Sequence, residues 1–200
     1  MSAALKSKVA DLVGKIAAKG QSQAALEELT AIANSEGRMA ECFLVEALQK
    51  IVDATNDKDK KVSAAAAATS RAVVEMASPF AIDLMMPAFL AGLSVKAKPE
   101  QKIVTLNMIG DFAKKYQKAT GYALVTLVSP VADLTCDIKK DVKVAAVECM
   151  TAICSCTGNK DLQPFLPSVV QAAQSLACTH GCVEKLAGCI FVQNLGRILH

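Results

Sequence analysis

The sequence Val142-Lys143-Val144-Ala145-Ala146 opens a helical segment whose apolar spacing decides the fold. Val62, Ile103 and Val183 open three similar segments, so the four start residues follow one another at intervals of 41, 39 and 41 positions. A period near 40 residues is typical of stacked helix pairs, because one pair alone cannot bury its apolar face. We therefore predict an all-α fold, an α-α superhelix of about five helix pairs, with function on its surface.

Outward from these segments, the apolar stripes and polar turns predict a single domain over residues 1–200. The five predicted pairs are 1–37, 38–78, 79–119, 120–158 and 159–200. Three first helices contain a proline, at Pro87, Pro130 and Pro167, each with apolar residues two and five positions earlier. A proline inside a helix removes one backbone hydrogen bond, so its recurrence at equivalent positions indicates that the resulting bend serves packing.

The composition favours closely packed helices in a reducing compartment. Hydrophobic residues make up 52% of the chain but aromatic residues only 4%, so the core must come from many small contacts. Asp11 interrupts the place where a signal peptide needs an apolar core, and no stretch approaches the roughly 18 apolar residues of a membrane span. We therefore expect a cytoplasmic protein whose eight cysteines are reduced, with no membrane partner.

Lysines gather in the turns between the paired helices. Equivalent turns of a solenoid stack along one edge, so separate clusters would form a basic ridge able to follow a phosphate backbone. The competing interpretation is a solvated edge whose lysines pair with Asp57, Asp59, Asp137 and Asp141. The net charge of +3 excludes a whole-surface nucleic-acid binder, and few aromatic residues accompany the lysines, so we expect no base stacking and no DNA partner. The candidate binding residues are Lys58, Lys60, Lys61, Lys96, Lys98, Lys102, Lys139, Lys140 and Lys143.

The period, the proline-containing first helices and the Val-x-x-Ala-Ala start of the second helices together resemble HEAT repeats. Within that class, Lys139 to Ala146, Met150-Thr151 and Asn159 to Ser168 look like the amino-terminal HEAT region of translation elongation factor 3. The segments 101–103 and 188–192 fit the same register. The likeness covers most of residues 40–195.

This resemblance implies the HEAT arm of a ribosome-dependent ATPase that helps to clear tRNA from the exit site during translation elongation. The expected partners are small-subunit rRNA and ribosomal proteins. The chain has no Gly-x4-Gly-Lys-Ser/Thr loop, since Val9 stands where the first glycine should precede Gly14-Lys15. We therefore expect no enzyme and no cofactor in this chain, with ATP and magnesium relevant only if the missing cassettes exist downstream. The alternative is a general HEAT scaffold, including a ribosome-associated regulator of the Gcn1 type.

Two weaker hypotheses concern the cysteines. Cys178, His180 and Cys182, with Cys154 and Cys156 one repeat earlier, have metal-ligand chemistry, but their spacing lacks the tight Cys-x2-Cys hairpin of zinc sites. We interpret these cysteines as packing residues and predict no metal. A Cys182 nucleophile with His180 as base is disfavoured, because residues two apart on a helix face away from each other.

The last residues, 194–200, offer no polar capping repeat, although solenoids need one at a free end. We therefore expect the natural protein to continue beyond them or to dock its last helix elsewhere.

Overall fold

The structure, a computed structural model of the chain, describes residues 3–18 and 20–158. Within these ranges all regular structure is helical, which confirms the predicted all-α class. Short 3-10 turns connect several of the helices. The α-helices of the described part are α1 (Ala3–Ile16), α2 (Ser22–Glu36), α3 (Glu41–Asp53), α4 (Lys60–Met76), α5 (Ile82–Leu93), α6 (Pro99–Lys115), α7 (Gln117–Leu134) and α8 (Lys140–Cys154).

The chain divides into two compact units, residues 1–108 and residues 109–200, and each is described by itself. Unit 1 contains α1 to α5 and most of α6, whereas unit 2 contains the end of α6 with α7 and α8. The predicted fifth pair, 159–200, lies outside the described residues. The count of five pairs and the assignment of the whole chain to one domain therefore stay predictions.

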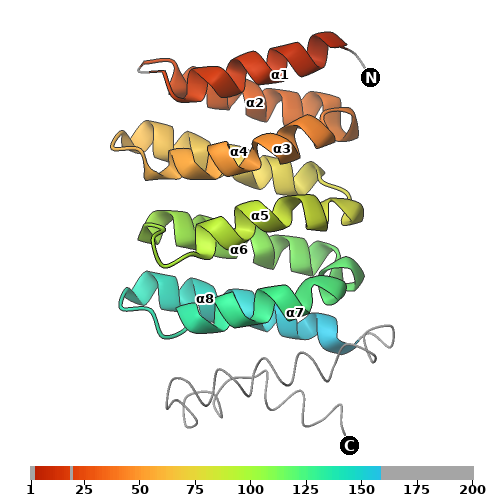
Figure 1. Cartoon of the computed structure of the whole chain (residues 1–200), viewed down its shortest axis with the longest axis vertical. Coiled ribbons are helices and arrows are strands. Elements are labelled where there is room, and N and C mark those ends of the chain that lie inside the picture. The colour runs from red at the N-terminus through yellow and green to blue at the C-terminus, as the bar shows by residue number, and fades with distance from the viewer. Residues whose placement is uncertain (1–2, 19, 159–200) are drawn as a thin grey trace, which may run out of the picture. The chain divides into compact units, whose positions relative to one another are not determined.

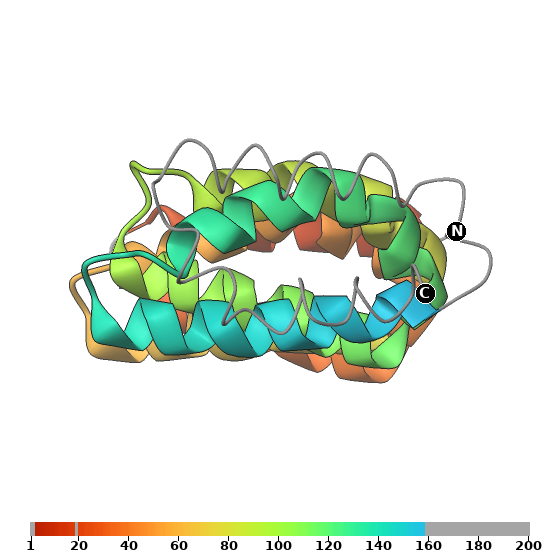
Figure 2. The ribbon, with the colours of Figure 1, turned by 90° about the horizontal axis from the view of Figure 1, so that it is seen from below.

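Within unit 1 the helices form two rows. Figures 1 and 2 show α1, α3 and α5 in one row and α2, α4 and α6 in the other. Helices two apart in sequence, such as α1 and α3 or α2 and α4, pack side by side, and so do the two members of a pair. Buried leucines of α2 and α3, including Leu26, Leu29, Leu44 and Leu48, fill the space between the rows. This two-row stack of hairpins is the arrangement of a HEAT or armadillo-like repeat.

Small residues let α2 and α4 approach closely. In the alanine run of α4, Ala66 is completely buried, and Thr69 follows on the same side. The Thr69 hydroxyl lies 3.0 Å from the carbonyl oxygen of Leu26 in α2, and 2.9 Å from the Thr30 hydroxyl. A side chain reaches the backbone of a neighbouring helix only when the two helices are near, so the alanines serve packing here.

Local chemistry explains where the helices end. Gly20 and Gly37 have φ angles of 82° and 51°, which favour glycine, and they lie in the turn before α2 and at its end.

Pro87 lies inside α5 and Pro130 inside α7, as predicted for the first helices of the pairs. Pro167 lies outside the described residues. Of the apolar residues predicted to accompany them, Met85 and Val128 are buried, but Val125 is exposed.

In unit 2, α7 and α8 form an antiparallel pair that packs through buried aliphatic residues and thiols. Leu127 and Val131 of α7 and Ile153 of α8 are completely buried, and Phe112 at the end of α6 is nearly so. The unit repeats the construction of the pairs in unit 1.

The register predicted for α6 is wrong by two residues. The sequence pattern placed Ile103 in line with Val62 and Val142, but Ile103 is only half-buried. Val62 and Val142 are each the third residue of a helix, and the third residue of α6 is Gln101, which is buried. A period based on apolar residues misses a position at which a polar side chain is buried.

Among the described residues, no single helix has both the length and the apolar composition needed to cross a membrane. The segments Lys60–Met76 and Pro79–Leu93 satisfy both criteria only when taken together, and the chain bends by 120° between them.

Candidate functional site

The loop between α3 and α4 and the start of α4 present Lys58, Lys60 and Lys61 to solvent. Its two aspartates bond to the backbone: Asp57 Oδ1 accepts from the amide of Asp59, and Asp59 Oδ1 accepts from the amide of Lys61, both at 2.9 Å. The second bond caps the N-terminus of α4. The carboxylates thus hold the shape of the loop.

The loop between α5 and α6 carries Lys96 and Lys98, which are exposed, and Lys102 is half-buried in the first turn of α6. The Lys98 ammonium donates to the carbonyl oxygen of Asn56 at 2.9 Å. Asn56 belongs to the short turn that follows α3, so this loop lies beside the α3–α4 loop. Unit 1 therefore brings two of the predicted lysine clusters together at one edge.

In unit 2, Lys139 ends the loop between α7 and α8, and Lys140 and Lys143 lie in the first turn of α8; all three are exposed. Asp137 Oδ1 accepts from the amide of Lys139 at 2.9 Å, which repeats the bond that Asp57 makes in unit 1. The structure describes this cluster by itself within unit 2, and the ridge predicted from all three clusters stays a prediction.

All three clusters lie at the N-terminus of a helix, where the helix dipole is positive. Lysines there reduce stability by about 0.3–1 kcal/mol each when no acid compensates. The first turn of α4 has no acidic residue, while α6 has Glu100 and α8 has Asp141. Backbone amides and ammonium groups together make such an edge attractive to phosphate groups.

The predicted alternative, lysines neutralised by the loop aspartates, finds little support. Within residues 3–18 and 20–158, no ion pair within 4.0 Å involves Lys58, Lys60, Lys61, Lys139, Lys140 or Lys143. Asp57 and Asp59 direct an oxygen to a backbone amide instead. The binding role predicted for the lysines of these two loops stays a prediction.

Three of the described cysteines are buried and behave as packing groups, whereas Cys42 and Cys136 are exposed. Cys149, Cys154 and Cys156 are buried in unit 2, and Cys156 lies 3.8 Å from the carbonyl oxygen of Ala113. Burial raises the pKa of Cys149 to about 12, against a smaller lowering by Lys114. Burial likewise raises the pKa of Cys156 to about 11. Both thiols are protonated near neutral pH and are poor nucleophiles.

Among the described residues, no group of three or more His, Cys, Asp or Glu side chains could hold a metal ion. Cys178, His180, Cys182 and His200 lie outside the described residues, so the metal and nucleophile hypotheses based on them are not addressed there.

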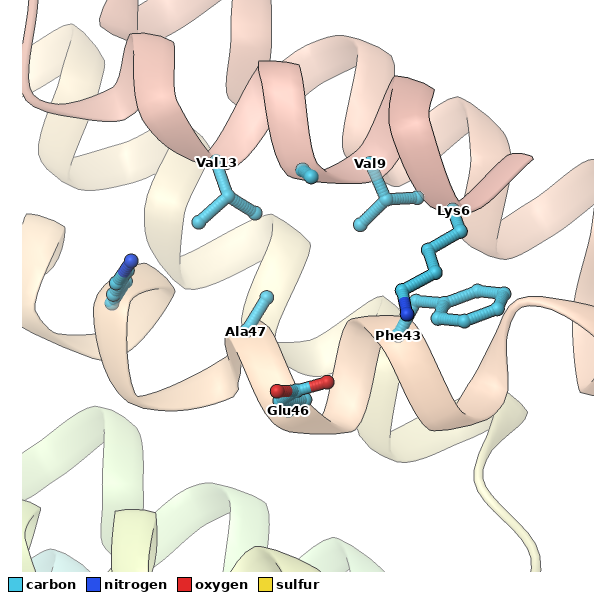
Figure 3. A pocket seen from close by; sticks show the side chains of 8 residues that line it. Lys6, Val9, Val13, Phe43, Glu46 and Ala47 are labelled. Atoms are coloured by element: carbon cyan, nitrogen blue, oxygen red, sulfur yellow. The ribbon is translucent and has the colours of Figure 1, made fainter. Parts of the chain in front are cut away.

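A pocket of about 340 Å³ lies between α1 and α3 in unit 1 (Figure 3). Its walls include Val9 and Val13 of α1 and Ala47 of α3, and Lys6 extends from α1 toward Phe43. The charged side chains around it, Lys6, Glu46 and Lys50, are exposed to solvent. The pocket therefore lacks the sequestered polar groups that fix a small ligand.

The sequence analysis missed the residues that join the two loops of unit 1. Gln101 Nε2 donates to Asp53 Oδ1 at 2.9 Å, and Gln101 Oε1 accepts from Asn56 Nδ2 at 2.7 Å. The signal in the sequence was that α6 has glutamine as its third residue, where α4 and α8 have valine. Reading that signal requires the helix start to be known within one residue.

Comparisons with known proteins agree with this architecture. The crystal structure of an engineered protein aligns with a TM-score of 0.54 at 18% identity, covering 94% of this chain and 78% of that one. Elongation factor 3 of Phytophthora infestans is 28% identical over 155 residues, which are 78% of this chain and 15% of the relative. The mRNA export factor elf1 of Schizosaccharomyces pombe is 23% identical over 175 residues, 86% of this chain and 17% of the relative.

The chain thus spans about a sixth of the length of these two relatives. The model of the family described as EF3 N-terminal HEAT repeat matches residues 2–150. This range includes all three lysine loops and the helices α1 to α7. The chain belongs to the family of EF3 N-terminal HEAT repeats.

Proposed function

We propose that this chain is a non-catalytic arm that docks onto the ribosome in the cytoplasm and supports translation elongation and exit-site tRNA release. Family membership supports the link to elongation factor 3. The observation that carries the docking mechanism is the placement of lysines at the N-termini of α4, α6 and α8, where they oppose helix stability. At each of these helix starts the lysines outnumber the acidic residues, which are Asp57 and Asp59 before α4, Glu100 in α6, and Asp137 and Asp141 at α8.

The proposed contact is with the phosphate backbone of small-subunit rRNA. Ammonium groups bind phosphates without reading base sequence, and each contact releases a counterion, so binding weakens steeply with salt. Ribosomal proteins complete the expected contact surface. ATP hydrolysis and magnesium binding would need nucleotide-binding cassettes, and the proposal is that the chain alone turns over no ATP.

The experiment is co-sedimentation of the purified chain with small ribosomal subunits at several salt concentrations. One triple variant combines K58E, K60E and K61E, and a second combines K139E, K140E and K143E. We expect each to bind at least about 10-fold more weakly, since three phosphate contacts become repulsive.

The matched control reverses three exposed lysines of α1 (K6E, K8E and K15E), which changes the net charge equally. Unchanged sedimentation of the loop variants, or an equal loss in the control, would refute docking through the loops. An ATPase assay of the chain with and without ribosomes tests the claim that the chain alone turns over no ATP. Turnover by the chain alone would contradict this claim.

The second candidate is a general HEAT scaffold, including a Gcn1-type regulator. The similarity to a relative named as an mRNA export factor favours keeping this alternative. It predicts binding to a protein partner that persists at a salt concentration at which the subunits are released.

A further inference from the structure

The loop between α5 and α6 lacks the aspartate that closes the other two lysine loops. Asp57 and Asp137 each lie three residues before the start of their helix and accept a hydrogen bond from the amide two residues on. The residue at this position before α6 is Lys96. The lysine in place of aspartate adds a cation at the edge but removes the side-chain bond to a nearby amide that fixes the other two loops.

Gln101 supplies a different fixation. It is 5% exposed, although an amide is costly to bury unless it is hydrogen-bonded. Its side chain bonds to Asp53 at the end of α3 and to Asn56 in the turn that follows. Lys98, which precedes the rigid Pro99, adds a third bond to the carbonyl oxygen of Asn56. The side chains of this loop are therefore held by the preceding helix pair, in addition to the bond between the Ala97 amide and the Ser94 carbonyl oxygen within the loop.

We propose that Gln101 is a positioning residue that locks the α5–α6 loop against the α3–α4 loop, so that both clusters act as one phosphate-binding surface. The inference rests on the proposed ribosome docking. It names Gln101 as the residue that organises the part of the docking surface that lies in unit 1. Locking matters because a surface ordered before binding loses less conformational freedom when it meets its partner. Both loops then contact phosphates in the same encounter.

The first test uses the full chain without any partner. The variant Q101V gives α6 the valine that α4 and α8 have as their third residue, so a buried side chain still packs at this position. We expect the variant to stay folded, by circular dichroism and thermal unfolding, while the amides of Ala97 and Lys102 exchange hydrogen about 10-fold faster. These two amides are hydrogen-bonded within the loop and the first turn of α6. Unchanged exchange would overturn the locking role.

Two variants of Asp53 separate locking from general damage. D53A removes the acceptor for Gln101 at an exposed residue and leaves the buried glutamine in place, so it should reproduce the faster exchange. D53N keeps an acceptor oxygen and should exchange like the wild type. If D53A exchanges like the wild type, Gln101 does not act through Asp53 and the proposal fails.

The second test measures binding to small ribosomal subunits as a function of salt. If Q101V uncouples the three lysines of the α5–α6 loop, the slope of log affinity against log salt becomes shallower by about 2, and D53N leaves it unchanged. A merely destabilised chain would reduce the active fraction without changing this slope. An unchanged slope and affinity in Q101V would overturn the coupling.

The outcomes distinguish the two proposals. If the lysine reversals leave sedimentation unchanged, ribosome docking through the loops is wrong, while hydrogen exchange still decides whether Gln101 locks the loop. If the reversals weaken binding and Q101V does not, docking stands and the role of Gln101 falls.

Discussion

The starts of α6 and α8 present lysines in the same way but are built differently. In α8 the third and seventh residues are Val142 and Ala146, both completely buried. The corresponding residues of α6 are Gln101 and Thr105, which are also buried but polar. The α7–α8 loop is closed locally by Asp137, whereas the α5–α6 loop is held through Gln101 by the preceding helix pair. Equivalent loops of one repeat protein can thus be ordered by local or by long-range bonds.

We expect the largest loss of stability when glutamine, the third residue of α6, is introduced as the third residue of α8. Val142→Gln buries an amide at a completely buried position, which should lower the free energy of unfolding by about 3 kcal/mol. Urea unfolding measures the change. Wild-type stability in this variant would show that the two helix starts tolerate the same residues.

The second effect concerns Gly92 in α5, which makes room for Thr105. A Cβ at residue 92 would collide with the Thr105 side chain, whose hydroxyl is bonded to the carbonyl oxygen of Gln101. We expect Gly92→Ala to destabilise the chain by about 2 kcal/mol and Thr105→Ala to restore most of the loss in the double variant.

Gly14→Ala is the matched control for Gly92, since nothing lies within 4 Å of a Cβ at that position in α1. This change should stabilise the helix by about 0.5 kcal/mol. Equal thermal stability of the Gly92 variant and the wild type would show that α5 and α6 can move apart, and that the threonine does not constrain them.

The smallest effect tests whether the lysines reduce stability. Lys60 is the first residue of α4, so Lys60→Glu places a negative charge at the positive end of the helix and should stabilise it by about 0.5 kcal/mol. The same change should weaken binding to small subunits. Lys15→Glu near the end of α1 reverses a favourable charge and should destabilise the chain instead. A Lys60→Glu variant that loses stability would remove the electrostatic argument for the lysine placement.

The sequence alone predicted the helix-pair fold and the position of the lysines at the starts of second helices. Val62 and Val142 mark those starts because apolar residues at helical spacing must face a neighbouring helix. The turns before them follow from Asp57, Asp59 and Asp137, whose side chains bond to amides only two residues away. These interactions are local, so they can be recognised without knowing which helices pack together.

The tertiary structure decided which side chains serve as partners. Gln101 bonds to residues 48 and 45 positions earlier, and Thr69 bonds to a carbonyl group 43 positions earlier. No local rule identifies these pairs, because a polar residue on an apolar helix face is accepted only if a neighbouring helix happens to offer it a donor or an acceptor. The repeat period is determined by each helix separately, and the hydrogen bonds between repeats exist only once the helices are stacked.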